Sequence, residues 1–228
     1  MIINPQISQN NKEPRSKILD FLKTKKFNTV IDFGGSVDLW AKDYVTHLVD
    51  IKRTDNFSEK NFLKCDLDYD EDWDALENLC EKNGKFDFAI CSHVLEDLNA
   101  PYIFCKKISK IAKAGYIAMP FKGSEFSFFE RCYPSSNPLK GYMGYHHHRW
   151  IYEIRNNILT GYPKMNCIDQ WCKFPSELTG YPPYWEINFL WEDDFSYHFI
   201  KPFELLDPPD GDHKIYQLFS HDDISVKL

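Results

Sequence analysis

The chain has 228 residues, enough to bury one full hydrophobic core. Hydrophobic residues make up 43% and charged residues 27%, which is typical of a globular domain and excludes a disordered or fibrous chain. The formal net charge is −7, and there is no dense stripe of Lys and Arg of the kind that nucleic-acid-binding proteins usually show. We therefore expect a small-molecule partner and no nucleic acid.

Membrane and secretory features are absent from the sequence. No apolar run approaches the ~20 residues needed to cross a bilayer, and the polar N-terminus MIINPQISQNNKEPRSK lacks the apolar segment of a secretory signal. The seven cysteines are scattered and form no C-x-x-C pair, so neither a disulfide framework nor a zinc ribbon is indicated. We expect a soluble, cytoplasmic protein without a membrane partner; the oligomeric state stays open.

The first fifty residues predict a leader, two strands and two helices. Residues 1–14 show no periodicity and read as a loose leader, whereas 15–25 carry apolar residues at helical spacing. Residues 28–33, NTVIDF, form a β-branched run that enters a Gly-Gly-Ser turn. A short helix is expected at 37–44, and 46–52, THLVDIK, is a second buried strand.

The next segments continue the alternation of strand and helix. A short strand at 62–65 precedes a helix at 71–82, and 86–93, FDFAICSH, is a near-continuous apolar run typical of a strand buried on both faces. A helix starting near Pro101 leads to a fifth strand at 116–120. This alternation predicts an α/β fold, namely a Rossmann-like, doubly wound and mostly parallel sheet.

The amino-acid composition changes after Pro120, where Pro, Gly, aromatic residues and His become frequent. Residues 150–162 predict a hairpin turning near Asn156-Asn157, and 185–191 with 195–200 predict a second, antiparallel hairpin. We expect a single domain over 1–228. Its parts are a sheet core at 15–120, an inserted aromatic-rich lobe at 121–184, and a C-terminal hairpin and tail at 185–228.

Four segments at the ends of the predicted strands carry a resemblance to a known family. VIDFGGS, LVDIK, LKCDLD and FDFAICSHVLEDLNAP occur in this order within residues 28–120. Together they resemble the class I S-adenosylmethionine-dependent methyltransferases, particularly the type 11 methyltransferase domain. The resemblance implies S-adenosylmethionine (SAM) as cofactor and methyl transfer as the reaction. It also implies a substrate region after the fifth strand.

The resemblance assigns roles to residues at the strand ends. Asp32 and the turn after it would line the methionine part, Asp50 would accept hydrogen bonds from the ribose hydroxyls, and Asp66 would meet the adenine amino group. Ser92 and His93 would border the transferred methyl. The full set of expected cofactor-binding residues is Asp32, Gly34, Gly35, Ser36, Asp50, Ile51, Asp66, Leu67, Ser92 and His93.

Two departures from the family pattern affect the same region. The family's D/E-x-G-x-G-x-G appears here with Ser36 and Asp38 in the second and third glycine places, and Asp97 stands where the family often has His. A nicotinamide cofactor fits less well, because the G-x-G-x-x-G fingerprint is not met. Acidic residues in the loop would also repel a pyrophosphate, by roughly 3 kcal/mol for two unit charges 5 Å apart at an effective dielectric of 20. The alternative to an active methyltransferase is an inactive binding or scaffold protein with the same fold.

The acceptor side is less defined. Methyl transfer from a sulfonium is an in-line displacement that gains up to ~7–11 kcal/mol from alignment, and it needs a base only if the acceptor must lose a proton. His93 and His147, the latter in the run His146–His148, are the candidate bases; the alternatives are a pocket-shaping residue and a solvated loop. We expect no metal, because Cys132, Cys167 and Cys172 show no recognised ligand spacing around that run.

The aromatic residues in and near the lobe have two interpretations. They either fill a small core or wall a pocket for an apolar or sugar-like acceptor that would be methylated on O or N. Arg149 could pair with an acceptor's phosphate or carboxylate, or form a surface salt bridge. The aromatic residues in question are Tyr142, Tyr145, Trp150, Trp171, Tyr181, Tyr184, Trp185 and Trp191.

Overall fold

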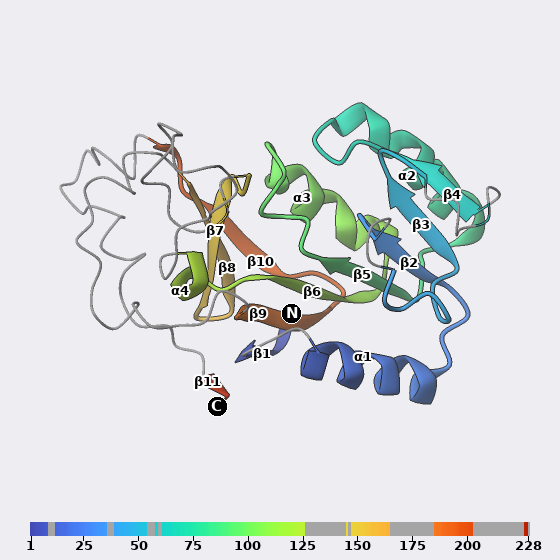
Figure 1. Ribbon diagram of the computed structural model, residues 1–228. Helices are drawn as coiled ribbons and strands as arrows, with labels where there is room; N and C mark the ends of the chain where they lie inside the picture. Colours follow the sequence, from blue (N-terminus) through green and yellow to red (C-terminus); the bar gives the residue numbers. More distant parts are fainter. Residues whose placement is uncertain are drawn as a thin grey trace, which may run out of the picture.

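The computed structural model describes residues 1–8, 12–35, 39–53, 58, 61–125, 145, 147–164, 185–202 and 226–227. They form an eight-stranded and a three-stranded sheet with helices packed against the larger one (Figure 1). The strands are β1 (Ile2–Ser8), β2 (Val30–Phe33), β3 (His47–Asp50), β4 (Phe62–Lys64), β5 (Phe88–Ser92), β6 (Ala114–Pro120), β7 (Trp150–Arg155), β8 (Ile158–Pro163), β9 (Glu186–Glu192), β10 (Ser196–Phe199) and β11 (Val226–Lys227). The helices are α1 (Lys12–Lys25), the 3₁₀ turn η2 (Asp70–Trp73), α2 (Asp74–Asn83), α3 (Pro101–Ile111) and α4 (Lys122–Glu125).

The parallel half of the large sheet has the order β4-β3-β2-β5-β6. From β2 the chain moves outward to β3 and β4, then returns to the other side of β2 with β5 and β6, so the strand order reverses between β2 and β5. In open α/β sheets ligands bind outside the carboxyl ends of the strands at such a reversal. This arrangement confirms the expected Rossmann-like fold class.

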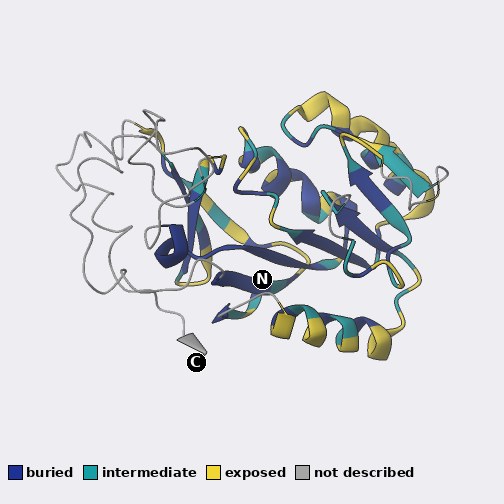
Figure 2. Cartoon of the chain, viewed as in Figure 1, coloured by how far each residue is buried: buried dark blue, intermediate teal, exposed yellow. Residues whose placement is uncertain are grey.

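Helices cover both faces of this sheet, and the sheet strands are buried accordingly (Figure 2). On one face α1 packs Ile18 and Leu22 against β2, β5 and β6, while its outer side stays exposed. On the other face η2, α2 and α3 bury Trp73, Leu76 and Phe104 against the same strands. The strands are therefore apolar on both sides, which explains their nearly unbroken hydrophobic runs.

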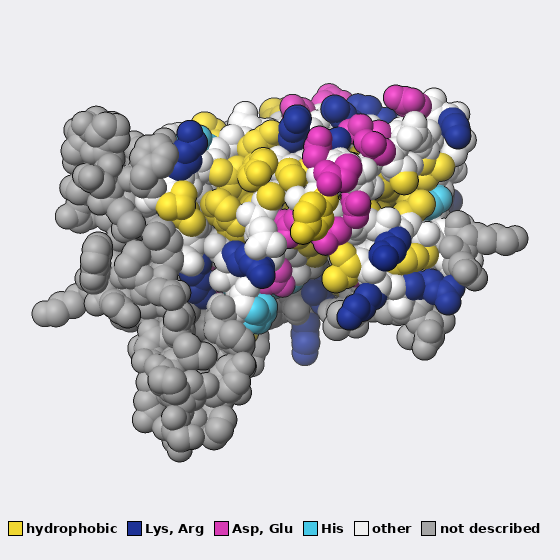
Figure 3. Space-filling model, turned by 90° about the horizontal axis from the view of Figure 1, so that it is seen from above, with side chains coloured by type: hydrophobic (Ala, Val, Ile, Leu, Met, Phe, Trp, Pro, Cys, Tyr) yellow, Lys and Arg dark blue, Asp and Glu magenta, His cyan; other side chains and the backbone are white. Residues whose placement is uncertain are grey.

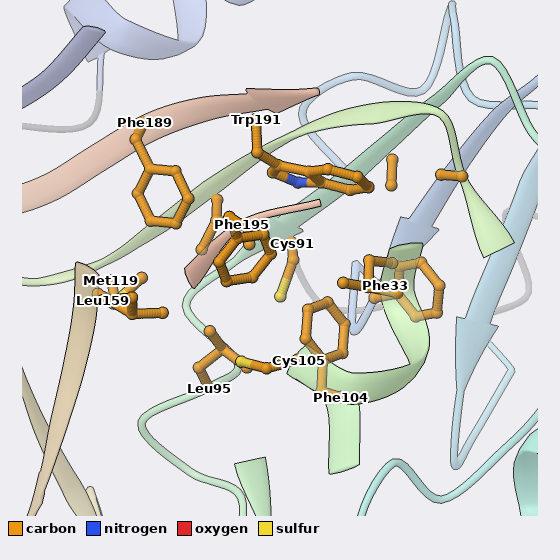
Figure 4. Close-up of a cluster of buried hydrophobic side chains, with 14 of the residues drawn as sticks. Phe33, Cys91, Leu95, Phe104, Cys105, Met119, Leu159, Phe189, Trp191 and Phe195 are labelled. Atoms are coloured by element: carbon orange, nitrogen blue, oxygen red, sulfur yellow. The ribbon is translucent and has the colours of Figure 1, made fainter. Parts of the chain in front are cut away.

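The core on the α2–α3 face extends across the sheet to β9 (Figure 4). Phe33 of β2 stacks on Trp73 at 5.8 Å and meets Phe104 edge-on at 5.3 Å. Trp191 of β9 and Phe195 after it are 5.8 Å apart in the same cluster, which joins the two halves of the sheet. The four cysteines in the described segments, Cys65, Cys80, Cys91 and Cys105, are buried free thiols.

Three strands, β9, β1 and β11, extend the sheet beyond β6, and β1 corrects the prediction for the N-terminus. β9 pairs with β6 on one side and β1 on the other, and β11 pairs parallel with β1. Residues 2–8 are thus a strand, not a loose leader, and the tail contributes a short strand as well. The sequence pattern did not predict β1 because Pro5 and the bulge between Ile3 and Gln6 interrupt the alternation of apolar and polar residues along this strand.

The small sheet confirms one expected hairpin and shows that the other is wrong. β7 and β8 pair antiparallel around Asn156 and Asn157, both of which have positive φ, as a tight hairpin turn requires. β9 and β10 do not pair with each other: β9 lies in the large sheet and β10 runs parallel to β8. β9 is buried on both sides, so it needs a neighbour on each, whereas β10 alternates between exposed and half-buried residues and suits an edge.

The helix expected at 37–44 is not formed by its described residues, 39–44. Successive turns occur instead, with hydrogen bonds from Lys42 N to Leu39 O and from Tyr44 N to Ala41 O. One i→i+4 hydrogen bond follows in the described residues 39–45, from Val45 N to Ala41 O at 3.1 Å, and a single such bond does not offset the cost of nucleating a helix. No helix in the described ranges combines the length and hydropathy needed to cross a membrane. The division into core, lobe and tail stays a prediction.

Candidate cofactor site

A single cavity of about 720 Å³ lies over the carboxyl ends of β2, β3, β4 and β5. Asp32 comes from β2, Asp50 from β3 and Ser92 from β5, while Asp66 follows β4. Parallel pairing brings these strand ends to one edge of the sheet. The cavity is lined by nine of the ten expected residues: Asp32, Gly34, Gly35, Asp50, Ile51, Asp66, Leu67, Ser92 and His93. Ser36, the tenth, lies outside the described residues, as does Asp38.

The turn after β2 requires glycine at two consecutive positions. Gly34 has φ of +73°, and a Cβ there would overlap the side chain of Val94. A Cβ at Gly35 would overlap the carboxylate of Asp32. The backbone is therefore packed directly against the β5 loop and against a buried acid. Gly34 N also donates to Val49 O at 2.8 Å, which ties the turn to β3.

The loop after β4 is held by its own aspartates. The Asp72 carboxylate accepts a hydrogen bond from Asp66 N at 2.9 Å, and the Asp66 carboxylate accepts one from Asp68 N at 3.2 Å. Asp68 in turn accepts hydrogen bonds from Ala100 N and from the Asn99 side chain, both at 2.8 Å, which fixes the loop to the start of α3. The acids on the cavity wall are thus placed by short local turns.

His93 is clamped between two buried glutamates at the inner end of the cavity. Its Nε2 lies 3.0 Å from Glu186 Oε2 of β9, and its Nδ1 lies 3.3 Å from Glu96 Oε1. Burial alone would lower the pKa of His93, but the hydrogen bonds and charges of Glu186 and Glu96 outweigh it and raise the pKa to about 10. The residue also has a positive φ of 56°. A protonated imidazole has no lone pair for an incoming proton, so this state argues against His93 as the general base.

His147, the second expected base, is exposed and does not line the cavity. Its Nε2 lies 4.0 Å from Asp97 Oδ1, and Asp97 does line the cavity. Burial and the neighbouring Glu96 charge raise the pKa of Asp97 to about 6. His148 is buried beside His147, with 4.5 Å between the ring centroids, and its Nδ1 donates to Glu125 Oε1 at 2.6 Å. His146 lies outside the described residues.

Arg149 and its neighbours fasten the start of β7 to the loop after β5. Arg149 N and Trp150 N donate to Glu96 O at 2.6 and 3.2 Å, and the Arg149 guanidinium donates to Asp97 O at 2.9 Å. Trp150 Nε1 donates to Leu98 O at 2.9 Å. Trp150 thus packs at this junction instead of walling a pocket, and Arg149 lies on the cavity wall with Tyr145.

The other described aromatic residues of the lobe take the core-filling interpretation. Trp185 and Trp191 are buried in the main core, at 5% and 1% exposure. The remaining four lie outside the described residues: Tyr142, Trp171, Tyr181 and Tyr184.

The chemistry of the cavity suits a cationic nucleoside. Five aspartates, three of them at successive strand ends, line it against two arginines and the charged His93. In the described part of the chain, the buried Ser92 Oγ has no hydrogen-bond partner, so this hydroxyl can form a hydrogen bond with a ligand in the cavity. An adenosine carrying an amino group and a sulfonium offers both the donors and the positive charge that such a wall accepts.

Several cavity residues escaped the sequence prediction. Arg15 of α1 and Trp40 lie across the opening, with the guanidinium 5.3 Å from the centre of the indole ring. Neither belongs to a strand end, and no local pattern marks them. Asp68 and Asp97 could have been found, because each follows an expected site residue by one to four positions on the same loop.

Fold and site together define a Rossmann-like protein with an acidic cavity over the carboxyl ends of its parallel strands. No family model and no curated protein matches the chain. The methyltransferase domain of bacterial CtHen1-CN matches at a TM-score of 0.41 and 16% identity, over 78% of this chain and 98% of that one. The N-terminal domain of EvdMO1 with SAH bound matches at 0.35 and 13%, over 80% and 66%. The small RNA methyltransferase HEN1 matches at 0.41 and 13%, over 85% of this chain and 26% of that one.

At such identities a match concerns the fold alone. The matches correct one expectation. The absence of a nucleic-acid partner and the small-molecule acceptor were inferred from the net charge of −7, yet a matched protein is a small RNA methyltransferase. Net charge sums over the whole surface, whereas nucleic-acid contact depends on local groups. On the face shown in Figure 3 acidic side chains gather in one area and Lys and Arg lie around it.

Proposed function

We propose that this chain is a SAM-dependent methyltransferase. The observation that carries the proposal is the convergence of Asp32, Asp50 and Asp66, from three separate strand ends, on one cavity of about 720 Å³. When bound there, SAM supplies a methyl group on a sulfonium. Asp50 would accept hydrogen bonds from the ribose and Asp66 from the adenine amino group, with Leu67 packing on the ring. Asp32, behind the glycine turn, would face the positively charged methionine end.

The chain's own contribution to the reaction is placement and charge. Carboxylates stabilise the cofactor in its cationic form, and the turn at Gly34 and Gly35 lets backbone approach the ligand closely. The fixed loop after β5 borders the reacting end, where alignment of acceptor and methyl supplies most of the acceleration. Because His93 is held protonated, a proton-bearing acceptor would be deprotonated by another group on the wall or by water.

Binding is tested first, by calorimetry with SAM and with SAH. We expect one equivalent of either ligand to bind, and Asp50→Ala to weaken binding more than tenfold. Asp20→Ala, at an exposed position on α1 that does not line the cavity, is the matched control and should leave binding unchanged. No heat of binding at millimolar ligand, or equal affinities for Asp50→Ala and the parent chain, would refute the proposal.

Turnover is tested separately with labelled SAM. Cell extract is divided into an RNA fraction and a small-molecule fraction, and each is incubated with the parent chain and with Asp50→Ala. Label that enters one fraction only with the parent chain identifies the acceptor class. If SAM binds tightly but neither fraction is labelled, the proposal of an active enzyme is refuted and a second candidate function is favoured.

That second candidate is a non-catalytic binding module with the same fold. Two observations favour it: His93 is held in a charged form that cannot act as a base, and Ser36 and Asp38 replace two glycines of the family turn. Such a module would bind SAM or SAH with the same dependence on Asp50 but would label no acceptor.

A further inference from the structure

We propose that Asp97, His147 and His148 form a binding site for one divalent transition-metal ion at the rim of the cofactor cavity. One ligand atom from each residue lies within 4.8 Å of those of the other two. Two imidazoles and one carboxylate suit zinc, iron, cobalt, nickel or manganese better than calcium or magnesium. The absence of a metal site was inferred from cysteine spacing along the chain and left out Asp97, which the fold brings to the histidines from fifty residues earlier.

The fold holds these residues together through the junction of β7 with the loop after β5. Arg149 N and Trp150 N both donate to Glu96 O, and the Arg149 guanidinium donates to Asp97 O. Glu96 and Asp97 are adjacent in the chain, as are His148 and Arg149, so these hydrogen bonds fix the carboxylate beside the two imidazoles. The constellation therefore rests on backbone contacts between the two segments and not on the side chains alone.

His148 has the surroundings of a metal ligand. Its Nδ1 donates to Glu125 Oε1 at 2.6 Å, which leaves Nε2 as the nitrogen for coordination. Glu125 is buried and accepts hydrogen bonds from both His148 and Lys164. Metal-bound histidines typically donate their other nitrogen to a carboxylate, which sets the tautomer and the ring orientation. Lys164 Nζ holds the second oxygen of Glu125 at 2.6 Å, so this support is rigid.

The other two ligands can close on an ion with small movements. Two atoms bound to one ion at about 2.1 Å lie at most about 4.2 Å apart, and Asp97 Oδ1 to His147 Nε2 is already 4.0 Å. Both side chains are about half exposed, so rotation about their side-chain bonds is unhindered by a packed core. Three protein ligands leave at least one coordination position for water or for an oxygen of a second ligand.

The location gives the ion access to the acceptor side of the cavity. Asp97 itself lines the cavity, together with Tyr145 and Arg149, and Tyr145 packs against the His148 ring at 4.6 Å between centroids. An ion here would present a positive charge and an open position to an acceptor oxygen. This inference goes beyond the proposed function, and metal binding is measured without SAM, so the failure of one does not decide the other.

The test is titration of the metal-free full chain with Co²⁺ and Zn²⁺ by visible absorption and calorimetry. We expect one equivalent of Co²⁺ to bind with a Kd in the micromolar range or lower. The visible absorption bands should be those of Co²⁺ with a low coordination number, and there should be no thiolate charge-transfer band. Asp97→Asn and His147→Ala should each weaken binding at least tenfold, and Glu125→Gln should weaken it 10- to 100-fold through His148. His198→Ala, an exposed histidine on β10, is the control and should bind like the parent chain.

Three results would overturn the proposal. The first is the absence of stoichiometric binding at millimolar Zn²⁺. The second is unchanged binding in both Asp97→Asn and His147→Ala, both of which alter exposed residues and should fold normally. The third is a thiolate charge-transfer band, which would place the ion on cysteines.

Discussion

His93→Asn tests whether the charged clamp between Glu186 and Glu96 stabilises the fold. Asparagine tolerates the positive φ of this position, so the change removes the charge without adding backbone strain. The imidazolium makes two charge-assisted contacts, at 3.0 and 3.3 Å, to carboxylates whose side chains are 1% and 2% exposed. A hydrogen bond to a charged group contributes about 1.5–3 kcal/mol. Because 37% of the His93 side chain remains exposed to solvent, we reduce the combined contribution of the two contacts to the free energy of unfolding to about 2–3 kcal/mol.

The pH dependence of this stabilisation follows from the direction in which folding shifts the pKa of His93. The pKa of His93 is raised to about 10 in the folded state, against 6.5 in an unfolded chain. Its contribution to the free energy of unfolding is therefore complete below pH 6.5 and is lost as pH rises through 10. The difference between parent and variant should thus be largest at pH 6.5 and below and should shrink as pH rises toward 10.

Urea unfolding at pH 5.5, 7 and 9.5 measures this difference, and thermal unfolding at pH 7 should show a fall of roughly 4–12 °C in Tm. NMR provides a direct check, because the His93 ring signals of the parent chain should not titrate between pH 5.5 and 8.5. His198→Asn, on the exposed edge of β10, should change stability by less than about 0.5 kcal/mol. A His93 titration near pH 6.5, or a loss no larger than that of His198→Asn, would contradict the reasoning.

Three further predictions concern the turn, the core and the hairpin. Gly35→Ala places a methyl group against the buried Asp32 carboxylate, so calorimetry should show SAM binding weakened more than tenfold and Tm should fall; unchanged affinity and Tm would mean that the turn relaxes freely. Trp73→Ala empties a fully buried site beside Phe33 and should cost about 3–5 kcal/mol in urea unfolding; a loss under 1 kcal/mol would show that the core collapses into the space. Asn157→Val puts a β-branched residue at φ of 59° and should cost about 1–2 kcal/mol, whereas Asn157→Gly should not destabilise.

The parallel half of the fold could be predicted from the sequence because local sequence patterns mark each of its strands. Each strand from β2 to β6 is a short apolar run next to a turn or helix, and the crossover rule then determines how successive strands can be joined. The convergence of Asp32, Asp50 and Asp66 follows from that topology, since parallel strands end at one edge. Nine of the ten residues expected to bind the cofactor therefore line one cavity, although no side-chain contact was known when they were named.

The rest of the fold depends on partners that are distant in sequence. β1 pairs with β9, with Gln6 donating to the Asn188 side chain across 182 positions, and no local pattern reports such a pairing. The same holds for β9 and β10, which look like a hairpin because three residues separate them but belong to different sheets. Likewise, the charge state of His93 depends on Glu186, which no motif links to it.

The position of Glu186 has a consequence for the order of assembly. The residues that line the cavity all precede residue 150, but the counter-charge that holds His93 arrives on β9, the strand that also joins β1 to the rest of the sheet. During synthesis the parallel strands can come together while His93 still lacks this partner. Docking of β9 then closes the sheet and sets the electrostatics of the cavity in the same event. A chain cut before residue 186 would keep every residue of the cavity wall and still present a different local charge to its ligand.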